Sequence, residues 1–342
     1  MSNLKVNTIN DASGGSNAVL YGVAAPANSM GFRNRLMNAN MAIAQRATSA
    51  TVTAGTAVPT SSTGYPAVDR FFVYSTGANV TAARVAGAGN TQYRMQITGA
   101  ASVTAVGVGQ RIEQLNSYDL AGVNATLSVD LANSLLTTVT WTASYATTAD
   151  TFGTIGTPTK TQIATGTFTV NSTVTNYTAT FAVPAAATTG VEVLLTVGAQ
   201  TSGTWTIGNI QLEAGSVASP FERRDYGREL GLCQRYLTVY GGTASSTAMG
   251  VGQVEGGGTA ANIPMFFPTT MRTAPTLSYQ GALSEFTFNR GGSGGTASSI
   301  TIAIASPYMT NVIYGISGGT AGYSVNIYTN ASTAKLLFSS EL

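Results

Sequence analysis

The chain has 342 residues, of which 44% are hydrophobic and only 9% are charged, and its formal net charge is +2. This length is enough for two domains, and the small net charge excludes a basic field for nucleic acid. No long apolar run is present, so no membrane span is predicted. The chain has one cysteine and no histidine, which excludes an intrachain disulfide, a Ser-His-Asp triad and the usual zinc sites.

Residues 1–30 contain too few apolar residues to form a core. Leu4, Val6 and Ile9 alternate weakly and are followed by a Gly- and Ser-rich stretch. The pattern predicts an extended arm whose short strands pair with another surface. The alternative is a disordered tail.

Residues 31–47 predict a helix. Ser29 is a suitable N-cap, and Phe32, Leu36, Met37 and Met41 then recur at spacings that place them on one face. A helix with so narrow an apolar face needs a partner. That partner is either the helix's own β-domain or two further copies of the chain around a symmetry axis.

Residues 48–218 predict an antiparallel jelly-roll β-sandwich, because Thr- and Val-rich runs alternate with short turn signals. Trp141 shares one face with Val139 and Ala143, so it is expected in the core. Trp205 begins the last strand and lies either in the core or at its rim. The expected strands span residues 70–75, 92–98, 103–113, 125–131, 137–145, 166–170, 175–183, 191–197 and 204–212.

Residues 219–236 form a charged joint that includes a short helix. Phe221 is expected to plug the bottom of the first sandwich, and Cys233 is expected to be a buried thiol. The charged residues alternate in sign and predict ion pairs, either within one chain or between neighbouring copies. These residues are Glu222, Arg223, Arg224, Asp225, Arg228 and Glu229.

Residues 237–342 predict a second β-sandwich, whose strands are separated by glycine clusters. Binding of a sugar needs exposed aromatic faces on which the ring can stack. The candidates for glycan contact are Trp205, Tyr308, Tyr314, Tyr323 and Tyr328. For each of them the alternative is packing between strands.

Several motifs resemble those of bacteriophage tail fibres and related virion structural proteins. The most specific lies in the joint, at residues 210–236, and consists of the sequence motifs IQLEAG, ASPFERR, YGREL and LCQRY. Further matching blocks are RNRLMN at 33–38, QR at 45–46, YPAVDRF at 65–71, QRIE at 110–113, FPTTMRTAPT at 267–276 and SEL at 340–342.

This resemblance implies a component of the virion, assembled in the host cytoplasm. The low charge of the chain suits an assembly whose copies bury one another, so we expect a homotrimeric fibre. Its arm, with Leu4, Val6 and Ile9, would attach to other tail or head proteins. Its jelly roll, similar to carbohydrate-binding modules, would contact host-surface polysaccharide, and its second sandwich would be the tip. Such jelly rolls often hold a structural calcium ion, for which Glu213 is a conceivable ligand, with a salt bridge as its alternative role. No other cofactor and no other metal is expected.

Two other functions remain open from the sequence. One is a purely structural head fibre, cement or tail-adaptor protein without a receptor. The other is a glycan depolymerase, which would need a pair of carboxylates. Asp119, Asp130 and Asp150 lie between or at the ends of strands without an evident acid partner, so we expect no enzymatic activity.

Overall fold

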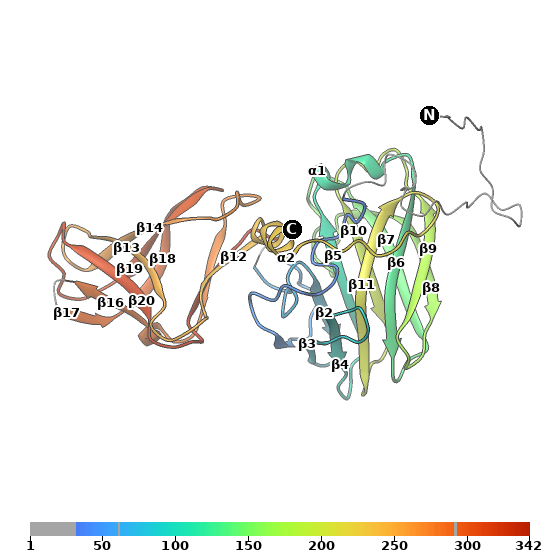
Figure 1. The fold of residues 1–342 in the computed structure, drawn as a ribbon, viewed down its shortest axis with the longest axis horizontal. Helices are drawn as coiled ribbons and strands as arrows, with labels where there is room; N and C mark the ends of the chain where they lie inside the picture. Colours follow the sequence, from blue (N-terminus) through green and yellow to red (C-terminus); the bar gives the residue numbers. More distant parts are fainter. Residues whose placement is uncertain (1–31, 61, 291–292) are drawn as a thin grey trace, which may run out of the picture.

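The computed structural model describes residues 32–60, 62–290 and 293–342, and it consists almost wholly of β-strands. Two β-lobes lie end to end, with helix α2 (Tyr226–Gln234) and the end of the chain between them (Figure 1). We call residues 32–221 the N-lobe and residues 237–339 the C-lobe. The prediction of an all-β protein is confirmed. The expected arm, with Leu4, Val6 and Ile9, falls outside the described residues.

The N-lobe is a sandwich of two antiparallel sheets. Successive strands pass repeatedly from one sheet to the other, as in the predicted jelly roll. Within the described residues, the six-stranded sheet has the order β1 (Ser49–Val52), β3 (Val80–Ala86), β4 (Tyr93–Thr98), β11 (Thr204–Ala214), β6 (Asn124–Asn133) and β9 (Thr175–Ala182). The five-stranded sheet has the order β2 (Phe72–Thr76), β5 (Ala105–Ile112), β10 (Val191–Val197), β7 (Thr138–Ala146) and β8 (Lys160–Thr169).

The core of the N-lobe comes from the alternation of residues along these strands. On β7, Val139, Trp141 and Ala143 point inward and are buried, as predicted. The Trp141 ring stacks on Phe181, with 5.3 Å between the ring centroids. Short helices α1 (Gln114–Ser117) and η2 (Tyr118–Leu120) connect β5 to β6.

The C-lobe has a small and a large antiparallel sheet that share a separate core. Over the described residues, the small sheet has the order β12 (Leu237–Gly241), β21 (Lys335–Ser339) and β15 (Thr276–Gln280). The large sheet has the order β17 (Ser293–Thr296), β16 (Phe286–Arg290), β20 (Ser324–Thr329), β13 (Ala248–Val254), β14 (Ala260–Phe266), β19 (Met309–Gly315) and β18 (Ser299–Ala305). Helix η3 (Leu283–Glu285) precedes β16.

The helix predicted for residues 31–47 is wrong, because residues 32–47 form an irregular segment. Phe32, Asn38 and Met41 have φ values of 45°, 54° and 60°, which no right-handed helix allows. The polar side chains of this segment bond to backbone groups within it and to other parts of the chain, in place of a regular helical pattern. For example, the Asn38 amide donates to the carbonyl oxygens of Ile43 and Asp69, at 2.8 and 2.9 Å. The apolar residues are indeed buried, but through a loop.

The end of the chain is inserted between the two lobes and meets a buried arginine of the N-lobe. Glu341 and Arg70 are each 1% exposed, and their carboxylate and guanidinium form an ion pair. Arg70 also donates to the carbonyl oxygen of Arg111 at 2.7 Å and lies 3.3 Å from the centroid of the Tyr236 ring. Its φ of 73° is rare for a residue other than glycine, so its surroundings must hold it in place.

A ring of further polar contacts surrounds this pair. Arg111 donates to the backbone oxygen of Leu342 at 2.9 Å and to the Glu192 carboxylate at 2.9 Å. Arg235 makes a two-pronged contact with Glu113, at 2.9 and 2.8 Å. Burial alone would raise the pKa of Glu113, but the hydrogen bond with Arg235, together with Tyr236 and the positive charges of Arg235 and Arg70, outweighs it and the pKa is lowered. The closing residues therefore belong to the junction and not to the tip of the second sandwich.

We predict that the substitution Glu341→Gln lowers the free energy of unfolding by about 3–5 kcal/mol, because it leaves the Arg70 cation buried without a counter-charge. Chemical denaturation of the full chain measures this change. Asp119→Asn is the control: it breaks the partly exposed Arg35–Asp119 pair and should cost less than about 1 kcal/mol. Equal losses in the two variants would contradict this account of the junction.

Candidate functional site

A polar groove lies on the outer face of the six-stranded sheet. The segment that follows β11 crosses this face on its way to α2 (Figure 1). It encloses a cavity of about 190 Å³ between its own residues and the strands beneath. The lining residues are Ser128, Asn176, Asn209, Gln211, Ser219, Pro220 and Phe221.

The register of the strands places a row of polar side chains across the floor of the groove. Gly208 of β11 pairs with Asp130 of β6, and Asp130 pairs with Asn176 of β9. Asp130 accepts a hydrogen bond from the Asn176 amide at 2.9 Å and another from the Asn209 amide at 2.8 Å. Amide and carboxylate groups are thus held next to one another on rigid strands.

A β-bulge between Gly208 and Gln211 turns Asn209 onto this face. Asn209 has a φ of 40°, a left-handed conformation that asparagine tolerates better than most residues. Both hydrogens of its amide are used, because it donates to Thr91 Oγ1 at 2.7 Å as well as to Asp130. Its oxygen is therefore oriented by the two bonds of its nitrogen.

Two buried polar atoms of the groove lack a hydrogen-bond partner among the described residues. They are the Asn209 side-chain oxygen and the Ser128 hydroxyl, whose residues are 9% and 6% exposed. A buried polar group without a partner costs about 1–3 kcal/mol. Both groups line the cavity, so a ligand with hydroxyl groups could satisfy them.

The wall of the groove is held in place by Glu213. Its carboxylate accepts hydrogen bonds from the Ser219 hydroxyl at 2.5 Å, from the Ser219 backbone N–H at 2.8 Å and from the Gln211 amide at 2.9 Å. Glu213 therefore anchors the crossing segment, and among the described residues it forms no salt bridge. Phe221, half-buried against the core, adds an aromatic ring to the wall.

Amides, hydroxyls and one aromatic ring thus line one groove, and two carboxylates, Asp130 and Glu213, hold these groups in place. Such a set can exchange hydrogen bonds with a polyhydroxylated ligand and can pack against one of its apolar faces.

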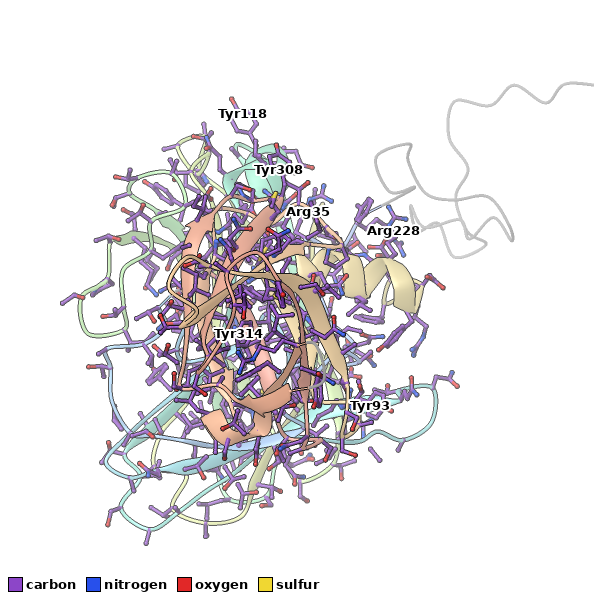
Figure 2. All side chains as sticks on the ribbon, turned by 90° about the vertical axis from the view of Figure 1, so that its left-hand side faces the viewer. Arg35, Tyr93, Tyr118, Arg228, Tyr308 and Tyr314 are labelled. Atoms are coloured by element: carbon purple, nitrogen blue, oxygen red, sulfur yellow. The ribbon has the colours of Figure 1, made fainter. Side chains whose placement is uncertain are left out.

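The five aromatic residues predicted to contact a glycan lie outside the groove, and two of them are buried. Trp205 and Tyr314 are fully buried, so neither can contact a glycan here and these two candidates are wrong. Tyr308 and Tyr323 are exposed, and Tyr328 is half-buried on β20. Figure 2 shows Tyr308 projecting near one edge of the molecule, while Tyr314 lies among the strands of the C-lobe. None of these residues lines the groove.

The charged joint makes fewer ion pairs than its sequence suggested. Arg224 pairs with Glu222 and Glu229, at 3.5 Å each, within one chain. Arg228 instead lies 3.7 Å from the centroid of the Phe32 ring, and Arg223 lies 5.8 Å from that of Phe221. Asp225 caps α2 by accepting from the backbone N–H groups of Gly227 and Arg228.

A second cavity, of about 450 Å³, lies where the irregular N-terminal segment meets α1 and α2. Its rim is apolar and exposed at Leu115 and Tyr118, and the Arg35–Asp119 pair lies beside them. Tyr118 projects outward from this region in Figure 2. The complete lining is Phe32, Asn34, Arg35, Met37, Leu115, Asn116, Tyr118, Asp119, Arg224 and Leu232.

Reasoning from the sequence missed the groove. A Gly208-Asn209 pair inside a strand pattern is the one local signal, since glycine within a strand suggests a bulge. The convergence of Ser128, Asn176 and Asn209 depends on the order of the strands, which the sequence pattern does not give.

Two features of other protein classes are lacking in the described part of the chain. No helix there is long and apolar enough to cross a membrane. No group of three or more Asp, Glu, Cys or His side chains is arranged there to hold a metal ion.

No protein-family model matches this chain, and no curated protein matches it. Among solved structures, the chain is similar to the enzymatically active domain of tailspike protein 4 of bacteriophage CBA120, with 15% identity and a TM-score of 0.32. The match covers 47% of this chain but only 21% of that domain's chain. The chain is also similar to a structure titled CBM4 (13% identity, TM-score 0.33, covering 47% and 95%). A third is the family 11 carbohydrate-binding module of Clostridium thermocellum, with 14% identity and a TM-score of 0.30. The match covers 46% of this chain and 95% of that module. Because these identities and TM-scores are low, the function of the chain has to be inferred from its own residues.

Proposed function

We propose that this protein is a receptor-binding component of a phage virion, and that the groove on its six-stranded sheet binds a host-surface polysaccharide. The observation that carries the proposal is the groove itself. Oriented amides and two unpartnered buried polar atoms lie beside an aromatic ring on a rigid sheet. The resemblance of the joint to phage fibres supports the assignment to a virion.

The chemistry of the groove favours binding over cleavage. Glycoside hydrolysis needs two carboxylates with separate roles, on either side of the bond that breaks. Asp130 is held by two amide donors, and Glu213 is held by Ser219 and Gln211. Both carboxylates therefore have structural partners, and we propose that the groove has no catalytic role.

We predict that the full chain binds at least some members of an array of purified bacterial surface polysaccharides. Asn209→Gly should weaken this binding about tenfold, because glycine keeps the left-handed backbone but removes the oriented amide. Asn330→Ala, in the C-lobe, is the control and should bind as the unaltered protein does. If Asn209→Gly leaves the affinity for every bound polysaccharide unchanged, the glycan contact lies elsewhere on the protein.

The same array separates the two alternative functions. A structural fibre, cement or adaptor protein would bind none of the polysaccharides. A depolymerase would release new reducing ends from one of them, whereas we expect none.

We further propose that the virion form is a homotrimer, supported by an exposed apolar face on the large C-lobe sheet. Phe266 of β14 and Ile304 of β18 are 68% and 69% exposed, and Val251 of β13 is 60% exposed. Pro264 lies between them on β14 and pairs with Asn311, which in turn pairs with Ile304. Because none of these residues is charged, this face can meet two further copies of itself around a three-fold axis without burying an unpaired ion.

The double substitution Phe266→Asp with Ile304→Asp should convert the assembled protein to single copies, since each buried carboxylate would oppose association. Sedimentation velocity measures the change, and circular dichroism shows that the strands persist. Val217→Asp, at an equally exposed apolar site in the N-lobe, is the control. An unaltered protein that sediments as one copy at all concentrations would contradict the trimer.

A further inference from the structure

Beside the cavity, the outer face of the six-stranded sheet continues past Gly208 to an arginine on the next strand. Ile207 of β11 pairs with Met95 of β4, so Gly208 and Arg94 are the next neighbours on this face. A Cβ atom added at Gly208 would lie 3.0 Å from Arg94 Cγ and 3.6 Å from its Nε. The side chain of Arg94 therefore passes over the bare backbone of Gly208.

Arg94 is the one arginine whose side chain makes no hydrogen bond, ion pair or ring contact with another residue of the described ranges. Its Nε is buried and has no partner. Neighbouring Arg84, by contrast, donates to the carbonyl oxygen of Ala42 and lies 4.3 Å from the centroid of the Tyr93 ring. A buried N–H of a cation without an acceptor is costly, so an acceptor from outside the chain would be stabilising.

Asp130 does not fill this role. Two strand spacings separate it from Arg94, which is about 10 Å between backbones. Its carboxylate is already bonded to Asn176 and Asn209. The outer face of the sheet therefore carries opposite charges at its two ends. The unpaired cation of Arg94 lies on β4, and the Asp130 carboxylate lies on β6 beside the Asn176 amide of β9.

We propose that the groove selects a carboxylated polysaccharide, with Arg94 binding the carboxylate and the Asn209–Ser128 end binding hydroxyls. This inference rests on the proposed glycan site. The fork of N–H donors in a guanidinium matches the two oxygens of a carboxylate. The Asp130 charge repels a carboxylate from the other end, which fixes the direction of the chain in the groove.

The test compares acidic polysaccharides with the same polymers after their carboxyl groups are reduced to alcohols. The probes are polygalacturonate, alginate and polysialic acid with their reduced forms, neutral dextran, and poly(glycerol phosphate). The full chain should bind at least one acidic polymer more than tenfold tighter than its reduced form. Arg94→Met, which keeps the stem over Gly208, should abolish this difference. Arg290→Met in the C-lobe, the control, also removes one positive charge and should leave this difference in affinity unchanged.

Three results would overturn the inference. If the acidic and reduced polymers bind equally well, and Asn209→Gly weakens both, the glycan site stands but its selectivity for carboxylates is contradicted. Binding to poly(glycerol phosphate) alone assigns Arg94 to phosphate instead. Binding to none of these polymers, nor to any member of the polysaccharide array, contradicts the glycan site itself.

Discussion

The burial of the Glu341 carboxylate beside Arg70 is the constraint on which the arrangement of the two lobes depends. Both groups are almost completely removed from water, and neither could be buried without the other. Arg70 comes from the N-lobe and Glu341 from the end of the chain just after the last strand of the C-lobe, so the pair ties the two lobes together. Separating the lobes would expose Tyr236 and Cys233 as well, whose pKa values are raised by burial.

The groove differs from the junction in where its unpartnered polar atoms lie. At the junction Arg70 and Glu341 form a buried ion pair, and Arg70 Nε and the Tyr236 hydroxyl, which lack a hydrogen-bond partner among the described residues, are enclosed by protein. In the groove the unpartnered atoms of Asn209 and Ser128 belong to residues that line a cavity. Unpaired polar groups are costly to a folded chain unless something else meets them. The junction is therefore the structural centre of the molecule, and the groove is the face that we propose for binding.

The sequence predicts the fold class well because alternation along strands is a local property. Trp141 was placed correctly from its neighbours Val139 and Ala143 alone. The helix predicted at residues 31–47 is wrong although the apolar spacing of Leu36, Met37 and Met41 fits a helix. Asn38 and Met41 have left-handed backbones, and Asn38 bonds to Asp69 and Glu229, which are distant in the sequence. The matched motifs at Gln45-Arg46, Gln110–Glu113 and Ser340–Leu342 lie far apart in the sequence but meet at one interface. Their shared place could not be predicted, since it depends on long-range topology.

Differential scanning calorimetry of the full chain tests the central claim most directly. If the chain end joins the lobes into one cooperative unit, a single transition should appear, with a van't Hoff enthalpy equal to the calorimetric enthalpy. Two separate transitions, one for each lobe, would show that the Arg70–Glu341 contact does not couple them and would contradict this account.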